Sequence, residues 1–178
     1  MSLRTALTHF IRPSATQSTA LLWAKSLLNA ALFFLVFMVV LPWAASRLLP
    51  VLLPVPPIAQ TWVAGALVVM GVASWLVCLD SFSRRGQGTP FPADAPRQLV
   101  TSGPFAMVRN PIMLAELAVI WAEALHFTNL GLFVYAALAS LAGHLAAVYV
   151  EEPELRQRFG SAYDEYCRRV PRWLPRLK

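Results

Sequence analysis

The sequence predicts an all-α integral membrane protein of about four transmembrane helices, ending in a helical hairpin and a helical tail. Composition is the first indication: 57% of the 178 residues are hydrophobic and 13% are charged. Soluble domains are about half apolar but about a quarter charged. The second is a series of apolar segments of bilayer-spanning length, and the third is the gathering of basic residues between them. We expect residues 1–178 to form a single membrane domain.

The N-terminal half predicts two membrane spans. Residues 1–25 mix basic and apolar residues, as expected of an uncleaved segment at the membrane surface. The first span covers 26–46, with a kink expected at Pro42. Four prolines within 48–57 predict a short, stiff turn outside the cytoplasm, and the second span covers 58–79. Each span has about 20 residues, the length that a helix needs to cross the hydrocarbon core.

The C-terminal half predicts a loop and a hairpin. Residues 80–110 are too rich in Gly, Pro and Arg to lie in lipid. Two apolar helices follow, over 111–126 and 128–150, and they complete the membrane region 26–150. Asn110 followed by Pro111 favours a helix start, with Asn as the N-cap and Pro in the first turn.

The tail, residues 151–178, is charged and helical. Pro153 is expected to open a helix and Gly160 to end it. Ser161 is expected to cap the next helix.

Charge sets the expected orientation. Every Lys and Arg except Arg47 falls in 1–25, 80–110 or the tail. Four crossings place these regions on one side, and the positive-inside rule makes that side cytoplasmic. We therefore expect the inner (cytoplasmic) membrane of a bacterium, with both termini in the cytoplasm. The net charge of +6 fits anionic lipid headgroups rather than nucleic acid.

Hairpin geometry predicts a site at the cytoplasmic edge. Because the helical rise is fixed at about 1.5 Å per residue, His144 should lie opposite Asn110. Ser140, His144 and Glu151 should share one helix face. The expected lining is Arg109, Asn110, His144, Glu151 and Glu152.

These residues suit a ligand with groups of both charges. The amides at a helix start, assisted by Arg109, favour a carboxylate or phosphate. The pair Glu151 and Glu152 favours an ammonium group or ribose hydroxyls. Two acidic residues at the C-terminal end of a helix interact unfavourably with the helix dipole, which indicates that they have a partner. S-adenosylmethionine carries a carboxylate, an ammonium and a ribose; a lipid headgroup offers some of the same groups.

The motifs occur in a characteristic order. They are Gly103-Pro104-Phe105, Arg109-Asn110-Pro111, Glu151-Glu152, Phe159-Gly160-x-x-Tyr163-x-x-Tyr166 and Val170-Pro171-Arg172. In this order and spacing, residues 60–175 resemble the isoprenylcysteine carboxyl methyltransferase-like family, to which phospholipid N-methyltransferases are related. The resemblance implies an integral membrane methyltransferase that uses S-adenosylmethionine. It also implies that the first three motifs enclose the cofactor, and we expect the tail to cover this site.

We accordingly expect methyl transfer to a lipophilic or amphiphilic acceptor at the cytoplasmic membrane face. No catalytic residue is identified. Glu116 and Glu123 lie on one face of an apolar helix and are candidates for acceptor binding or for hydrogen-bonded packing. Cys78 and Cys167 lack metal-ligand spacing, so no metal is expected.

Two alternatives remain at this point. An NADPH-dependent, sterol-reductase-like membrane enzyme would use Arg156 and Arg158 for the 2′-phosphate. A non-catalytic membrane accessory protein with the same fold is the other, since Asn110, Met113 and Ala147 depart from the family's pattern. The sequence leaves open the acceptor, the choice among O-, N- and S-methylation, and the oligomeric state.

Overall fold

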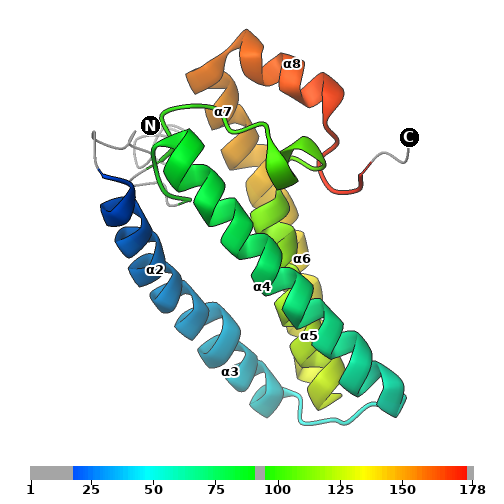
Figure 1. Ribbon diagram of the computed structural model, residues 1–178. Helices are drawn as coiled ribbons and strands as arrows, with labels where there is room; N and C mark the ends of the chain where they lie inside the picture. The colour runs from blue at the N-terminus through cyan, green and yellow to red at the C-terminus, as the bar shows by residue number, and fades with distance from the viewer. Residues whose placement is uncertain (1–17, 91–94, 176–178) are drawn as a thin grey trace, which may run out of the picture. The chain divides into compact units, whose positions relative to one another are not determined.

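The computed structural model describes residues 18–90 and 95–175, and the predicted all-α class is confirmed over these residues (Figure 1). Helices and turns account for the described chain, and an isolated β-bridge joins Leu52 to Asn129. Most of the predicted surface segment 1–25 lies outside the described residues. Its described part already belongs to the first helix, which begins at Thr19.

The first helix passes through a proline. It consists of α2 (Thr19–Leu35), the π turn η1 (Val36–Val40) and α3 (Leu41–Leu48). The N–H of Leu41 donates to the carbonyl of Val36, five residues back. This wider turn accommodates Pro42, which lacks an N–H and would clash with the carbonyl four residues earlier. The expected kink at Pro42 therefore takes the form of a π turn within a continuous helix.

The second helix is longer than predicted. Its parts are η2 (Ala59–Val63), α4 (Ala64–Ser81) and η3 (Phe82–Gly86). The predicted loop 80–110 is therefore wrong at its start, since helical structure continues to Gly86. Gln87 then ends the helix in the left-handed conformation, with φ 52°.

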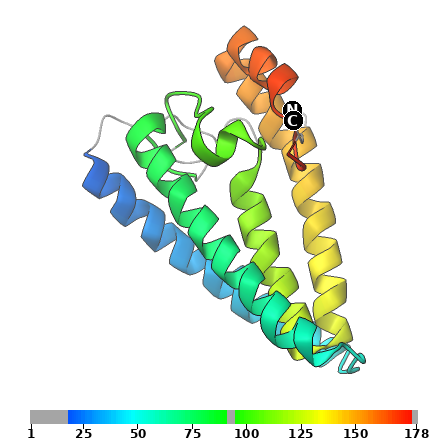
Figure 2. The same cartoon turned by 45° about the vertical axis from the view of Figure 1, so that its right-hand side comes forward.

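The predicted hairpin is confirmed. Helices α5 (Pro111–Phe127) and α6 (Leu130–Ala146) pack together: a Cβ added to Gly143 would lie 2.7 Å from the sulfur of Met113. Trp121 Nε1 also donates to Ser140 Oγ at 3.2 Å. Figure 2 shows the two helices meeting at their connecting turn.

The helix after the hairpin turn does not end at 150. It continues through the π turn η6 (Ala147–Glu151) into α7 (Glu152–Phe159). The prediction that Pro153 opens a new helix is therefore wrong; Pro153 follows a π turn, as Pro42 does. Gly160, with φ +54°, ends the helix as predicted.

The last helix, α8 (Ser161–Arg169), begins directly after Gly160. Ser161 is its first residue and Gly160 is its N-cap, without a side-chain hydrogen bond. The predicted capping role of Ser161 is therefore wrong. A short 3₁₀ helix, η5 (Gly103–Ala106), lies in the segment that leads to α5.

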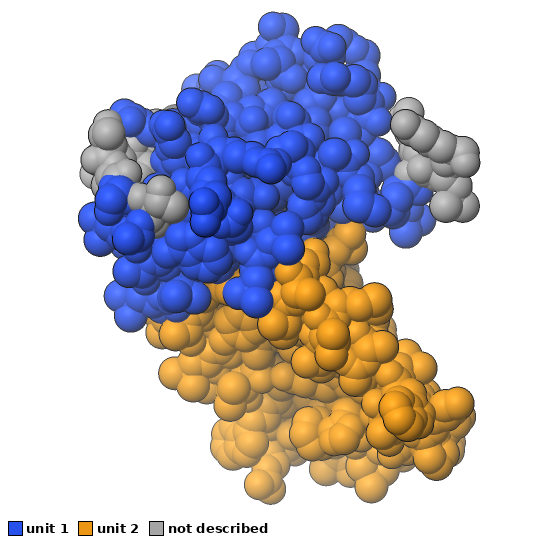
Figure 3. Space-filling model, viewed as in Figure 1, with its two compact units in different colours: residues 1–29, 76–111, 144–178 blue, residues 30–75, 112–143 orange. Residues whose placement is uncertain are grey.

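The chain forms two compact units, coloured in Figure 3. Unit 1 comprises residues 1–29, 76–111 and 144–178, and unit 2 comprises 30–75 and 112–143. The core of unit 2 is apolar and includes Met38, Ile120, Ala124, Leu132 and Ala136.

Within the described ranges 18–90 and 95–175, three helices are long and apolar enough to cross a bilayer: Ala20–Leu48, Ala59–Gly86 and Leu130–Phe159. They expose large apolar side chains, such as Leu28 and Trp62, as an integral membrane protein does toward lipid. Helix α5 has 17 residues, so the fourth crossing stays a prediction.

Candidate functional site

The segment before helix α5 is held by buried aromatic contacts in unit 1. Gly103 adopts φ +64°, a conformation that favours glycine. The ring of Phe105 packs edge-on against that of Phe82, with the centroids 5.2 Å apart. Tyr166 Oη donates to the carbonyl of Phe105 at 2.6 Å. Helix α8 therefore fixes the Gly-Pro-Phe motif immediately upstream of Arg109.

Arg109 joins this segment to both the Glu pair and the tail. Its Nη1 donates to Glu152 Oε1 at 3.0 Å and to Cys167 Sγ at 3.0 Å. Its backbone N–H donates to the carbonyl of Pro171 at 2.9 Å. Because the side chain is only 12% exposed, these are interactions within a largely dehydrated environment.

Glu152 is buried and lies at the centre of a group of charges. Its side chain is 3% exposed and receives hydrogen bonds from Arg172 at both oxygens, at 2.5 and 3.0 Å. Arg156 Nη2 lies 3.5 Å from Glu152 Oε2. We call Glu152, Arg109, Arg156 and Arg172 the Glu152 cluster. Burial of a carboxylate requires such partners.

The two residues of the Glu pair therefore differ. Glu151 is exposed, whereas Glu152 is buried. The π turn explains the difference: its extra residue shifts the following side chains by about 100° around the helix axis. Glu152 consequently takes approximately the face that uninterrupted α-helical geometry assigns to Glu151. The expected common face of Ser140, His144 and Glu151 is wrong for this reason.

The expectation that Glu151 and Glu152 lie at the C-terminal end of a helix is also wrong. Glu151 and Glu152 lie where η6 meets α7, and the helix continues to Phe159. They are not at a helix C-terminus, so the ion pairs of Glu152, rather than a dipole, account for its burial.

Within unit 1, residues of the tail pack against one another and against His144. Trp173 Nε1 donates to Nδ1 of His144 at 3.1 Å. Tyr163 and Tyr166 are buried beside Val170, and burial raises the pKa of both phenols. The hydrogen bond to Glu152 raises the pKa of Arg172 further. The phenols stay protonated and Arg172 stays charged at neutral pH.

Two neighbouring donors have no hydrogen-bond partner among the residues described. They are Nε of Arg109 and Nδ2 of Asn110, and both atoms are buried. Buried donors in native proteins are nearly always paired. Both residues precede Pro111, the first residue of α5. This donor set suits an anionic group such as a carboxylate.

The structure groups most of the predicted site residues in unit 1. These are Gly103, Pro104, Phe105, Arg109, Asn110, Pro111, His144, Glu151 and Glu152. Glu116 and Glu123 belong to unit 2, where they are half-buried on α5. Among the described residues, no group of three or more His, Cys, Asp and Glu side chains could hold a metal ion.

Sequence reasoning missed the partners of Glu152. Arg156 follows it at i+4, a spacing that predicts an ion pair on a helix. Arg172 belongs to a tail motif, but nothing in its spacing indicates contact with Glu152. Nothing in the sequence around Cys167 predicts its contact with Arg109.

Comparison with known proteins assigns the family. A model of the phospholipid methyltransferase family matches residues 59–162. The chain belongs to the phospholipid methyltransferase family. The resemblance stated from the motifs, which included the phospholipid enzymes, is thereby confirmed. The match covers η2 through the start of α8 and so includes the Gly-Pro-Phe, Arg-Asn-Pro and Glu-Glu motifs.

Two curated relatives have different names. The chain is 33% identical over 138 residues to methanethiol S-methyltransferase 2 of Bradyrhizobium diazoefficiens, covering 70% of this chain and 52% of that protein. It is 27% identical over 118 residues to the nickel-cobalt-cadmium resistance protein NccN of Alcaligenes xylosoxydans xylosoxydans, covering 66% and 54%. The chain therefore spans about half the length of the curated relatives that it matches.

Proposed function

We propose that this protein transfers a methyl group from S-adenosylmethionine to a lipophilic acceptor at the cytoplasmic membrane face. One observation carries the proposal: among the described residues, Arg109 Nε and Asn110 Nδ2, on consecutive residues just before α5, are both buried and without hydrogen-bond partners. Each can donate to a carboxylate, and the guanidinium also carries the complementary charge. The carboxylate of the cofactor's methionine portion is such a group.

The remaining predicted residues fit the same ligand. Glu151 is exposed and can accept hydrogen bonds from an ammonium group or ribose hydroxyls. Gly103, Pro104 and Phe105 form the segment before Arg109, in which Phe105 is buried, Pro104 is half-buried and Gly103 is exposed. Bound S-adenosylmethionine supplies a methyl group on a sulfonium, which is a good leaving group. The protein then contributes by orienting the reactants and excluding water.

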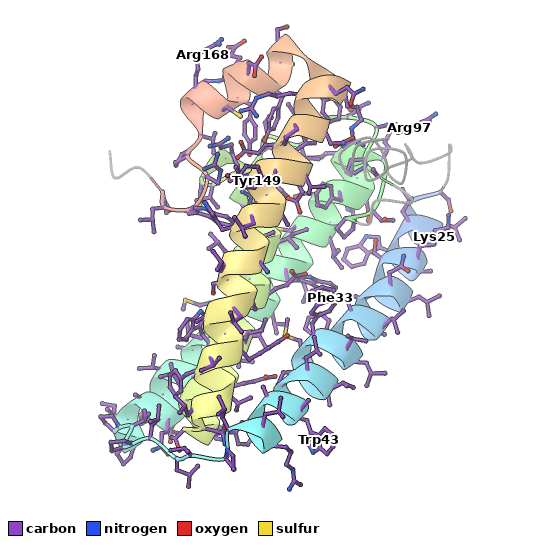
Figure 4. All side chains as sticks on the ribbon, turned by 180° about the vertical axis from the view of Figure 1, so that it is seen from behind. Lys25, Phe33, Trp43, Arg97, Tyr149 and Arg168 are labelled. Atoms are coloured by element: carbon purple, nitrogen blue, oxygen red, sulfur yellow. The ribbon has the colours of Figure 1, made fainter. Side chains whose placement is uncertain are left out.

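Charge supports the cytoplasmic placement of unit 1. Every Lys and Arg that the structure describes belongs to unit 1, except Arg47. Lys25, Arg97 and Arg168 are labelled among them in Figure 4. The positive-inside rule places such a unit at the cytoplasmic surface, where the cofactor is available.

The comparisons suggest two classes of methyl acceptor. The name of the Bradyrhizobium relative favours a small lipophilic thiol, and the family description favours a phospholipid amine. Glu116 and Glu123 remain candidates for the acceptor side because carboxyls among apolar helices usually face a polar cavity or bundle interior.

The nicotinamide alternative would use Arg156 and Arg158 for the 2′-phosphate. Arg156 pairs with Glu152 and Asp164, and Arg158 pairs with Glu154. Arg158 Nε and Nη1 are nevertheless buried without a hydrogen-bond partner among the described residues, so the preference for the methyltransferase rests on the family match.

Calorimetry on the purified protein tests the proposal. We expect S-adenosylhomocysteine to bind, and Arg109→Gln to weaken binding about tenfold or more through loss of a charged hydrogen bond. Arg84→Gln is the matched control, because Arg84 is exposed and pairs with Asp80. Absence of binding by the folded protein overturns the proposal, and binding of NADPH instead favours the reductase. Binding without methylation of methanethiol or of phospholipids favours the non-catalytic role.

A further inference from the structure

The buried member of the Glu pair already has its full set of partners. Glu152 Oε1 accepts from Arg109 and Arg172, and Oε2 accepts from Arg172 and lies near Arg156. A carboxylate has about four lone-pair sites. Little capacity remains for a ligand at Glu152, although exposed Glu151 retains all of its own.

The segment Pro171–Trp173 is attached at three consecutive residues. The carbonyl of Pro171 accepts from the backbone N–H of Arg109. Arg172 forms the bidentate pair with Glu152, and Trp173 donates to His144. We call this segment the tail strap. Its docking depends directly on Glu152 and Arg109, since two of its three attachments involve those residues.

Arg109 connects the tail strap with the unpaired donors. Its Nη1 donates to Glu152, whereas its Nε, on the same planar guanidinium, is buried and has no hydrogen-bond partner in the described part of the chain. An anion bound at Nε holds the guanidinium in one orientation. In this orientation Nη1 also donates to Glu152, the residue to which the docked strap is attached.

We propose that Glu152 is a positioning residue that couples ligand binding at Arg109 to docking of the tail strap, and that Glu151 is the carboxylate available to the ligand. The proposal rests on the proposed function for the identity of the ligand. Coupling of this kind is reciprocal: the factor by which the ligand favours docking equals the factor by which docking favours the ligand.

The backbone amide of Arg109 reports docking without any ligand. Its acceptor is the carbonyl of Pro171, so hydrogen exchange at Arg109 requires the strap to leave. In the full-length protein, Arg172→Gln should accelerate this exchange about tenfold or more, because a bidentate charged pair is lost. Glu152→Gln should do the same.

Two matched controls separate this effect from general charge loss. Arg169 and Glu165 form an exposed pair at 3.8 Å on α8, and Arg169→Gln should leave exchange at Arg109 unchanged. Glu151→Gln should also leave it unchanged. If Glu152→Gln does not fold, Arg172→Gln still decides, because it leaves Glu152 paired with Arg109 and Arg156. Unchanged exchange in Arg172→Gln overturns the positioning role.

The second measurement uses S-adenosylhomocysteine as the probe. Saturating probe should slow exchange at Arg109 in the unmodified protein. Arg172→Gln should weaken probe binding without contacting the probe, by at most the factor by which the probe slows exchange, because that factor is reached only when the strap is fully undocked. Glu151→Gln should weaken binding while leaving exchange in the free protein as it was.

The outcomes distinguish the two proposals. No binding of the probe to the folded protein overturns the proposed function and the coupling together, whereas the ligand-free exchange result still decides whether Glu152 positions Arg109. Binding that leaves exchange at Arg109 unaltered overturns the coupling alone. Unchanged affinity in Glu151→Gln overturns the assignment of Glu151.

Discussion

The two units are stabilised in different ways. Unit 1 contains the Glu152 cluster and the buried pair Tyr163 and Tyr166. Unit 2 is held by apolar packing and close backbone approaches: a Cβ added to Gly131 would lie 2.0 Å from the carbonyl oxygen of Ala45. The difference indicates that unit 1 responds to changes of charge and unit 2 to changes of volume.

The largest expected effect is removal of the central charge in unit 1. Glu152→Leu leaves Arg109 and Arg172 without their carboxylate, and loss of one partner in a buried ion pair costs about 3 to 5 kcal/mol. Thermal unfolding in detergent measures the loss. Glu165→Leu, in an exposed pair, should change stability by about 0.5 kcal/mol or less. Equal effects of the two variants would contradict the special role of Glu152.

The next effect is steric and belongs to unit 2. Gly131→Ala places a methyl group against the backbone of Ala45, and overpacking of this kind costs about 1 to 3 kcal/mol. Gly65→Ala is the matched control, because a Cβ there meets nothing within 4 Å and alanine favours the helix by about 1 kcal/mol. The melting temperature should fall in the first variant and rise in the second. An unchanged melting temperature in Gly131→Ala would contradict the inference that unit 2 is sensitive to side-chain volume.

Alkaline pH should destabilise unit 1 through its buried phenols. Burial raises the pKa of Tyr163 and Tyr166, so their stabilisation is fully present below the unfolded pKa of about 10. It is lost as pH rises toward the folded pKa, by about 1.4 kcal/mol per pH unit and group. Denaturant unfolding at stepped pH above neutrality measures this slope. Tyr163→Phe should reduce it; an unchanged slope would show that Tyr163 ionises equally in both states.

The smallest effect is expected for an acidic residue of unit 2. Glu123 is half-buried on α5, in a unit where Arg47 is the one Lys or Arg among the residues described. Glu123→Gln keeps the shape and removes the charge that is costly among apolar helices. We expect stability to change by about 0.5 kcal/mol or less. A loss as large as that of Glu152→Leu would mean that both units depend on ion pairs.

Local sequence signals predicted the ends of several elements. Pro111 starts α5 and Gly160 ends α7, because proline and glycine act on the backbone at their own positions. The hairpin followed from the polar residues between two apolar segments. The family followed from the order of the motifs, and the family match confirms it.

The continuity of the long helices could not be predicted in this way. A proline usually ends or kinks a helix, but η1 and η6 shift the hydrogen bonds of the preceding turn and let the helix continue past Pro42 and Pro153. The same shift determines which glutamate is buried. The pairing of Glu152 with Arg172 spans 20 residues and depends on the turn at Gly160, so helical periodicity carried no information about it.

The π turn at 147–151 decides which carboxylate faces the arginines. Straightening it into α-helix at unchanged chain length would rotate the following chain by about 100° and bring Glu151 to the face that Glu152 now occupies. Deleting one residue of the turn would instead remove the extra residue and leave Glu152 on its present face. In relatives of this chain, a one-residue deletion before the Glu pair is therefore compatible with burial of the second glutamate, whereas a regular α-helix of the same length favours the first.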